Sequence, residues 1–253
     1  ELAENFASAR EVFQEVNDAL SQDLFKIMVD GPDSALTMTA NTQPALMAFS
    51  MAVVRVLEKD FGIKLKEKDA FVAGHSLGEY SAACSAGVFS LSDTAKLLRI
   101  RGDAMQNAVP LGVGGMAAVL GLSYKDVGAL VEACSNDKDV CVAANDNSDG
   151  QVVLSGSMTA IDRAVEIAAE FGARKCVKLA VSAPFHSPFM RPAADAMARA
   201  FMDVKAHDAE IPLVANVLAE PITDHKEIIK HLIEQVTGTV RWRETMAYLQ
   251  EQG

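Results

Sequence analysis

A serine between two glycines is the residue whose setting points most directly to covalent chemistry. Residues 74–78 are Gly-His-Ser-Leu-Gly and match the pattern G-x-S-x-G, with Ser76 at the centre. An apolar run at 70–73 precedes the match and a helical pattern over 77–86 follows it, so Ser76 is predicted on a sharp strand-to-helix turn. Such a nucleophile elbow exposes the hydroxyl and needs small residues two positions before and after the serine. An ordinary glycine-rich turn is the alternative, and the flanking strand and helix favour the nucleophile.

The same turn is expected to supply groups that stabilise negative charge on the reacting carbonyl. The backbone N–H groups of Leu77 and Gly78 are predicted to point towards that carbonyl. The N-terminal end of the following helix adds partial positive charge at the same place. The sequence therefore predicts covalent acyl chemistry through Ser76.

A serine nucleophile needs a base, and the chain has five histidines. The side chain of His75 is expected to point away from the tight turn. His207, His225 and His231 stand among charged residues, where solvated faces are the usual interpretation. His186 follows the end of a predicted strand in a loop bracketed by prolines, where a scaffold presents catalytic side chains. We therefore predict His186 as the base, the alternative being a loop histidine satisfied by backbone.

The group that orients this histidine is left open by the residues themselves. Hydrolases with a nucleophile elbow use Asp or Glu placed between the serine and the histidine in the chain. The acidic residues in that interval fall mostly on predicted helix faces or turns, and they include Asp93, Asp103, Asp126, Glu132, Asp162 and Glu166. None of them stands at a strand end in an apolar setting.

Arg101 is a second candidate for chemistry, within a helical pattern over 91–108. A helical arginine is most often solvated. Arg101 lies in a locally apolar stretch, however, where a guanidinium would need a carboxylate partner.

The elements that must position these residues form a discontinuous α/β domain over 1–110 and 184–253. Its predicted helices cover 1–29, 44–59, 77–86, 91–108, 188–202, 224–236 and 241–251, and its predicted strands cover 70–73 and 213–217. Pro44 is expected in a first helical turn and Ser92 at a helix N-cap. The strand-then-helix order predicts a mainly parallel sheet with the site at the carboxyl ends of its strands.

The middle of the chain, 111–183, predicts an inserted subdomain. Its expected elements are strands at 115–122, 140–144, 151–155 and 174–181, helices at 123–135 and 158–171, and a turn at 145–150. Ser123 is the expected cap of the first helix. The order β-α-β-β-α-β is that of a ferredoxin-like unit, which can bury its own sheet face. The glycines at 112, 114 and 115 lack the Lys-Ser/Thr of a phosphate loop and are interpreted as a hinge.

Composition limits the partners and the setting. The net charge of −11 argues against nucleic acid as a partner, because it repels phosphate. No apolar run approaches a membrane span, and the first ten residues do not resemble a signal peptide. The four cysteines have neither C-x-x-C nor metal-ligand spacing, which favours reduced thiols in the cytoplasm and no metal.

With Glu79 and Tyr80 added, the serine motif resembles that of the malonyl-CoA:acyl carrier protein transacylases, a family of acyltransferases. The resemblance runs through most of the chain, with supporting stretches at 42–46, 100–106, 145–147, 150–153, 181–186, 235 and 240–242. It implies a hydrolase-like α/β domain with a ferredoxin-like small domain. It also implies that Ser76 is the acylated nucleophile, that His186 is its base, and that the backbone carbonyl of Gln235 orients the histidine.

The resemblance also implies how the acyl group is chosen. Arg101 would bind the free carboxylate of the malonyl group, and Gln43 and Asn145 match positions near the family's site. Leu77 after the serine resembles the malonyl-selective relatives rather than the methylmalonyl-selective ones. Relatives begin with a Gly-Gln-Gly segment that supplies the second oxyanion N–H and continue past Gly253 into a further strand, and these 253 residues include neither piece.

The implied reaction transfers malonyl from malonyl-CoA to the phosphopantetheine thiol of acyl carrier protein, supplying fatty acid synthesis. It needs no cofactor, and a monomer is expected. One alternative is a serine esterase or thioesterase with water as acceptor. It predicts that an Asp or Glu carboxylate orients His186. The other alternative is a non-catalytic acyl-binding domain, which would tolerate loss of the Ser76 hydroxyl.

Overall fold

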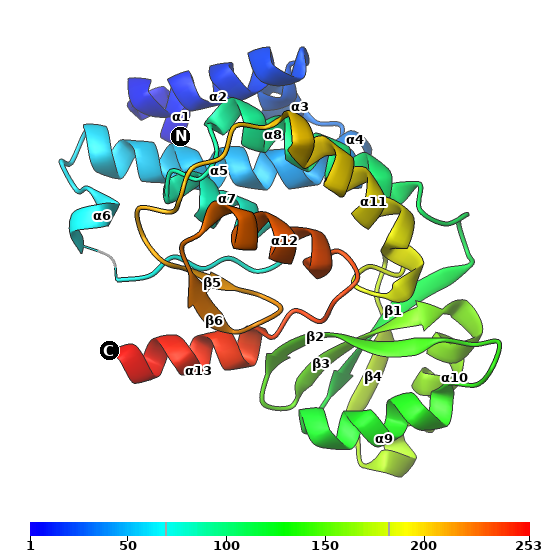
Figure 1. The fold of residues 1–253 in the computed structure, drawn as a ribbon. Helices are drawn as coiled ribbons and strands as arrows, with labels where there is room; N and C mark the ends of the chain where they lie inside the picture. The colour runs from blue at the N-terminus through cyan, green and yellow to red at the C-terminus, as the bar shows by residue number, and fades with distance from the viewer. Residues whose placement is uncertain (69, 182) are drawn as a thin grey trace. The chain divides into compact units, whose positions relative to one another are not determined.

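The computed structural model describes residues 1–68, 70–181 and 183–253. The predicted mixed α/β fold is confirmed, and the chain divides into two compact units (Figure 1). Unit 1 comprises Glu1–Asp103, Ala196–Ala215 and Glu220–Leu232. Unit 2 comprises Ala104–Asp195, Asn216–Ala219 and Ile233–Gly253.

Unit 1 is mainly helical. Its helices are α1 (Leu2–Asn5), α2 (Ala7–Leu20), α3 (Leu24–Asp30), α4 (Asp33–Leu36), α5 (Thr39–Lys59), α6 (Leu65–Lys68), α7 (Gly78–Ser85), η3 (Phe201–Asp203) and most of α8 (Leu91–Gln106) and α12 (His225–Gln235), which both run on into unit 2. Helix α2 packs on α5 through a stripe with the spacing of one helix face, formed by Ala9, Val12, Phe13 and Val16.

Helix α5 begins earlier than expected. The prediction that Pro44 opens the helix is wrong, because the helix starts at Thr39 and Pro44 lies inside it. Two side chains tie the start of α5 to the preceding turn: Asn41 donates to the Ala35 carbonyl at 2.9 Å and Thr42 to the Leu36 carbonyl at 2.6 Å. These bonds hold the first turn of the helix, which lies N-terminal to the proline that was expected to begin it.

One of the two predicted helix caps is correct. Ser123 accepts a hydrogen bond from the Asp126 N–H at 3.2 Å, as predicted. Ser92 is not a cap, because the Asp93 N–H donates instead to the Ser90 hydroxyl at 3.0 Å. A serine on either side of a helix start makes this boundary ambiguous in sequence.

The strand before the serine is weaker than predicted. Residues 71–73 are half-buried rather than buried, and Val72 forms a parallel bridge to Leu213. Leu213 begins β5 (Leu213–Ala215), which pairs antiparallel with β6 (Glu220–Ile222), a strand that sequence analysis missed. Among the described residues of unit 1, strand pairing therefore consists of one parallel bridge and one antiparallel hairpin.

Unit 2 contains a four-stranded antiparallel sheet in the order β2-β3-β1-β4 (Figure 1). Its strands are β1 (Gly114–Leu120), β2 (Cys141–Ser148), β3 (Gln151–Ser157) and β4 (Lys175–Lys178), and its helical segments are α9 (Tyr124–Cys134), α10 (Met158–Ile167), η1 (Ala168–Phe171), η2 (Pro188–Met190), α13 (Trp242–Gln252) and the first part of α11 (Arg191–Ala200). The segments from β1 to β4 follow one another in the predicted order.

Alternation along the strands of unit 2 separates two packing faces. Ala117 and Val119 of β1 belong to the core that also includes residues of α9 and α10. Met116, the intervening neighbour of Ala117, packs with Ala144 and Val153 on the other face. Both helices therefore share one face of the sheet.

The connection between β2 and β3 is shorter than predicted. The turn expected over 145–150 is wrong, because β2 continues to Ser148 with register shifts along its pairing with β3. A parallel bridge between Asn145 and Val240 supports this extended path: the Asp146 N–H donates to the Val240 carbonyl at 2.9 Å.

Among the helices in the described ranges, none combines the length and apolarity that crossing a membrane requires.

Candidate active site

The serine lies on a strained turn between the Val72 bridge and α7, as predicted. Ser76 has a φ of 53°, a left-handed conformation that non-glycine residues rarely adopt. A Cβ at Gly74 would stand 2.0 Å from the Gly78 carbonyl oxygen, so this position accepts only glycine. A Cβ at Gly78 would meet nothing within 4 Å, so this position does not require glycine itself.

The backbone of the turn changes the expected oxyanion donors. The Gly78 N–H donates to the His75 carbonyl at 2.9 Å, so this N–H is used inside the turn. Leu77 is half-buried and stands at the N-cap of α7. Of the two predicted N–H groups, Leu77 is therefore the better candidate for stabilising an oxyanion.

A buried guanidinium lies beside the serine. Arg101 is 1% exposed and donates from Nη1 to Gln43 Oε1 at 2.7 Å and from Nη2 to Ser76 Oγ at 3.2 Å. Burial lowers the pKa of Arg101, and the neighbouring Tyr80 and Glu79 oppose this shift. The structure thus brings three predicted site residues of unit 1 together and rejects the solvated alternative for Arg101.

A glycine permits this arrangement. A Cβ at Gly102 would lie 2.6 Å from the Thr39 carbonyl oxygen and 2.7 Å from the Ala40 Cα. Helix α8 therefore approaches the start of α5 closely enough for Arg101 to reach Gln43. Sequence analysis missed Gly102, and the signal that could have found it is a glycine in the middle of a helical pattern.

The histidine in unit 2 is buried and held by a backbone carbonyl. His186 has a φ of 54°, and its Nδ1 lies 2.8 Å from the carbonyl oxygen of Gln235. Because a carbonyl only accepts, Nδ1 carries the proton and Nε2 is left as an acceptor. This geometry suits a general base.

The loop that carries His186 is closely packed within unit 2. Ser187 donates its hydroxyl to the Pro184 carbonyl at 2.6 Å. A Cβ at Gly114 would stand 2.4 Å from Pro184 Cγ, so the start of β1 lies against this proline. The glycines interpreted as a hinge therefore include one that packs directly on the histidine loop.

Gln235 ends α12 and is fully buried. Its side-chain amide donates to the Asn216 Oδ1 at 3.5 Å, and Asn216 is fully buried as well. Sequence analysis missed Asn216, although a polar residue within an apolar strand pattern was a usable signal. Asn145, the remaining predicted residue of unit 2, is buried on β2 beside Val240.

The predicted site residues thus form one group in each unit. Ser76, Arg101 and Gln43 are joined by side-chain contacts in unit 1. His186 and Gln235 are joined in unit 2. Each group rests on contacts inside its own unit.

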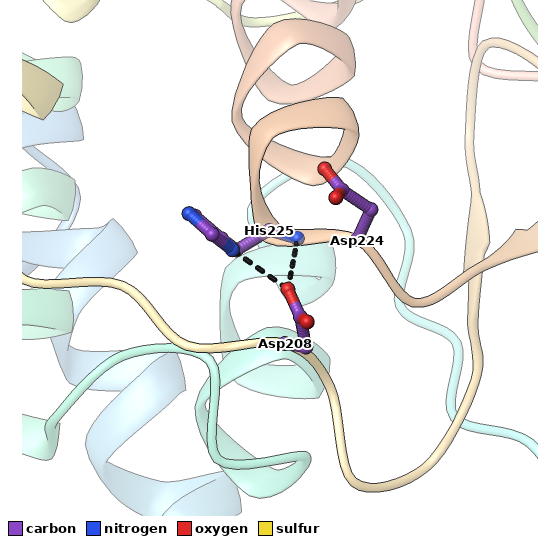
Figure 2. Close-up of side chains that lie close together, drawn as sticks. All are labelled: Asp208, Asp224 and His225. Carbon is purple, nitrogen blue, oxygen red and sulfur yellow. Dashed lines mark hydrogen bonds and ion pairs between the residues drawn. The ribbon is translucent and has the colours of Figure 1, made fainter.

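One cluster of described residues has the side-chain types of a metal site (Figure 2). Ligand atoms of Asp208, Asp224 and His225 lie within 4.8 Å of one another. Their bonds are those of a helix cap: Asp208 accepts from the His225 N–H and Nδ1, and Asp224 accepts from the next two N–H groups of α12. We therefore interpret the cluster as the N-terminal cap of α12.

Two buried cysteines are not activated as nucleophiles. Burial raises the pKa of the Cys84 thiol to about 11 and that of Cys141 to about 12, so both stay protonated near neutrality. His231 is buried, which corrects the solvated position expected for it, whereas His207 is exposed as predicted.

Comparisons with known proteins agree on one family. The family model described as acyl transferase domain matches residues 1–253. The chain is 39% identical over 255 residues to the malonyl CoA-acyl carrier protein transacylase of Haemophilus influenzae, covering all of this chain and 80% of that protein. The protein of the same name from Bacillus subtilis strain 168 is 37% identical over 253 residues, with 100% and 78% covered.

Solved structures give the same result. The chain is similar to the crystal structure of acyl-carrier-protein-S-malonyltransferase from Bartonella henselae, with a TM-score of 0.96, 53% identity and coverage of 100% of this chain and 80% of that one. It is also similar to a malonyl-transacylase in complex with its type II PKS acyl-carrier protein, with a TM-score of 0.94, 36% identity and coverage of 100% and 80%.

Proposed function

This chain belongs to the acyl transferase domain family, and from that premise we propose that it transfers malonyl groups from malonyl-CoA to the phosphopantetheine thiol of an acyl carrier protein. The product would supply fatty acid synthesis. The observation that carries the proposal is the buried guanidinium of Arg101, 3.2 Å from the Ser76 hydroxyl. A cation at this distance from a nucleophile fits an acyl group that carries its own carboxylate.

The proposed chemistry begins with Ser76 and His186. We propose that the two side chains act together on the thioester. His186 Nε2 accepts the hydroxyl proton while Ser76 Oγ attacks the thioester carbon. The C–S bond then breaks, coenzyme A leaves as the thiol with the proton from His186, and malonyl-Ser76 remains. The bond from His186 Nδ1 to the Gln235 carbonyl supports this role, because in the neutral imidazole it places the proton on Nδ1 and leaves Nε2 as the acceptor.

The second half reverses the first with another thiol. The phosphopantetheine thiol of the carrier protein gives its proton to His186 and attacks the malonyl ester. Ser76 takes the proton back as it leaves. One thioester replaces another, so the protein supplies rate and selectivity rather than driving force.

Arg101 would select the acyl group. Its guanidinium is already desolvated, so a malonyl carboxylate gains a charge-assisted pair without a new burial cost for the arginine. An acetyl group would leave the buried charge without that pair, at a cost of several kcal/mol (roughly 3–5). Gln43 would hold the guanidinium from the other side through its 2.7 Å contact.

The remaining roles follow from position. Leu77 would donate its backbone N–H to the oxyanion, since Gly78 donates within the turn. Asn145 would lie near the acyl group, on β2 of unit 2.

We extend the proposal to the finer architecture. Residues 1–110 and 184–253 would form a hydrolase-like domain with a mainly parallel sheet, of which the Val72–Leu213 bridge is one pairing. Residues 111–183 would form a ferredoxin-like subdomain, which the antiparallel order β2-β3-β1-β4 supports. The protein would act as a cytoplasmic monomer without a cofactor.

Intact-mass measurement after incubation with malonyl-CoA tests the function. We expect a malonyl adduct on the wild-type chain and none on Ser76→Ala, with the adduct discharged by a phosphopantetheine thiol. Rapid release of free malonate without a thiol would favour an esterase or thioesterase. Absence of any adduct on the wild-type chain would favour a binding domain and overturn the proposal.

A further inference from the structure

The guanidinium that contacts Ser76 lies over an aromatic ring. The Cζ of Arg101 lies 5.5 Å from the centroid of the Tyr80 ring. We propose that Tyr80 is a positioning residue for selectivity: its ring holds Arg101 in the orientation that favours acyl groups with a free carboxylate. This inference rests on the proposed function, since it concerns the acyl group that Ser76 accepts.

The guanidinium makes hydrogen bonds as well as the contact with the ring. In the plane, Nη1 donates to Gln43 Oε1 at 2.7 Å and Nη2 donates to Ser76 Oγ at 3.2 Å. All N–H bonds of a guanidinium lie in that plane, so its two faces have none to donate. The π-face of a ring attracts the charge itself, so this contact stabilises the cation without requiring an N–H donor that a substrate carboxylate needs.

A carboxylate at the position of the ring would act differently. It would form a charge-assisted pair with the in-plane donors and would compete with the malonyl carboxylate for them. A neutral aromatic face attracts the cation through its quadrupole and leaves the net charge available to the substrate. The ring thus explains how a guanidinium can be held firmly and still attract an anion.

Burial makes this interaction strong. Tyr80 is fully buried and Arg101 is 1% exposed, so water does not screen the contact between the ring and the charge. Burial also raises the pKa of Tyr80, which keeps the phenol neutral. Tyr80 therefore cannot become a phenolate partner that would neutralise Arg101.

Packing against a second aromatic ring holds Tyr80 in place. The rings of Tyr80 and Phe201 are stacked, with centroids 6.2 Å apart and an interplanar angle of 17°. Phe201 in turn lies 5.7 Å from Phe89. Tyr80 is one end of a row of three buried rings, and Arg101 lies beside that end.

The row provides matched variants for a test. Tyr80→Phe keeps the ring, whereas Tyr80→Leu and Tyr80→Met remove it and retain apolar volume. Phe89→Leu is the control, because it removes a buried ring from the other end of the row. The measurement is kcat/KM for Ser76 acylation by malonyl-CoA and by acetyl-CoA, with the melting temperature of each variant.

We expect the ratio of malonyl to acetyl kcat/KM to fall roughly five- to thirtyfold in Tyr80→Leu and Tyr80→Met, as loss of a desolvated cation–π contact would give. Tyr80→Phe should keep the wild-type ratio within about twofold, because Phe retains the aromatic face. Phe89→Leu should lower the melting temperature and leave the ratio unchanged. An unchanged ratio in both ring-removing variants, or an equal fall in Phe89→Leu, would overturn the inference.

The Arg101→Ala background shows whether Tyr80 acts through the guanidinium. There the addition of Tyr80→Leu should leave the ratio unchanged, and a further fall would assign the ring a role independent of Arg101 and overturn the inference. A wild-type chain that forms no malonyl adduct would defeat the proposed function and this inference together. Normal wild-type acylation with an unaltered ratio in the variants would defeat this inference alone.

Discussion

The two groups of site residues are built by different means, although each contains one strained residue. Ser76 in unit 1 and His186 in unit 2 have nearly equal φ angles, 53° and 54°. Around Ser76 the contacts join side chains to a buried charge. Around His186 the decisive contact is to a backbone carbonyl, that of Gln235.

This difference predicts how each group responds to substitution. A contact to a guanidinium depends on the identity of its side chains, so changes in unit 1 should alter which acyl group is accepted. A contact to a carbonyl depends on the path of the chain, so changes of side chain in unit 2 should matter less than changes of backbone. The largest effect is expected from a substitution in unit 1 that also changes the backbone, because it moves the turn that carries the nucleophile.

Gly74→Ala should abolish acylation. The new Cβ would stand 2.0 Å from the Gly78 carbonyl oxygen, and the turn that holds Ser76 would have to open. A displacement of about 1 Å at a reacting group costs ~10²-fold in rate, so we expect a loss on the order of 10³-fold or more in the rate of malonyl adduct formation.

Gly78→Ala is the matched control, because a Cβ there would meet nothing within 4 Å. It should form the adduct within about threefold of the wild-type rate, since a Gly→Ala change in a helix is neutral or stabilising where the new Cβ fits. Comparable losses in the two variants would show that the turn does not depend on the close approach of Gly74.

Arg101→Ala should give the next largest effect, and only on one substrate. We expect kcat/KM for malonyl-CoA to fall by roughly 10²–10³-fold, the cost of removing one partner of a buried charge pair. Acetyl-CoA should be used as well as before or better, because the buried charge is gone. Acylation kinetics with both thioesters measure this, and equal losses on both would make Arg101 a structural residue.

The chemistry of the site could be predicted where side-chain type carries it. The spacing of two glycines predicts Ser76, and the proline-bracketed loop after a predicted strand predicts His186. The residues alone left the group that orients His186 open, and only a family resemblance pointed to Gln235. Every residue has a backbone carbonyl, so nothing in the residue type of Gln235 marks it as the acceptor.

The fold could be predicted where the sequence pattern reflects local structure alone. The strands and helices from β1 to β4 follow hydrophobic alternation and caps, and they lie within a few residues of the expected ranges. Pro44 was misplaced because Asn41 and Thr42 bond to the preceding turn and start the helix earlier, and the turn at 145–150 because a long-range contact overrides local preference there. Asn145 lies in β2 instead because of its bridge to Val240, which is distant in the chain.

Arg243→Ala tests the one buried carboxylate of the described unit 2 that is paired with arginine. Asp146 is 1% exposed and accepts from Arg243 Nε at 3.0 and 3.1 Å, which joins β2 to α13. Leaving this carboxylate unpaired should cost about 2–3 kcal/mol of unfolding free energy, less than for a pair with both members buried, since Arg243 is partly exposed.

Chemical denaturation measures this change, and Lys178→Ala is its control. Lys178 pairs with Asp162 at the surface of unit 2, where loss of an ion pair costs about 0–1 kcal/mol. The ratio of malonyl to acetyl kcat/KM should stay at the wild-type value in both variants. A changed ratio in Arg243→Ala would mean that the charge-based selectivity assigned to unit 1 extends into unit 2.

Gln235→Ala should have the smallest effect. It tests directly whether His186 depends on a side chain or on a backbone carbonyl. The substitution keeps the carbonyl that accepts from His186 and removes the side-chain amide, which donates to Asn216 Oδ1 at 3.5 Å. We expect kcat/KM to fall by less than about tenfold, against ~10²–10⁴-fold for His186→Ala, which removes the base itself. The pH at which acylation is half-maximal should not move, because the proton on Nδ1 keeps its acceptor. A loss in Gln235→Ala as large as that in His186→Ala, or a shifted pH midpoint, would mean that the side chain rather than the chain path holds the histidine.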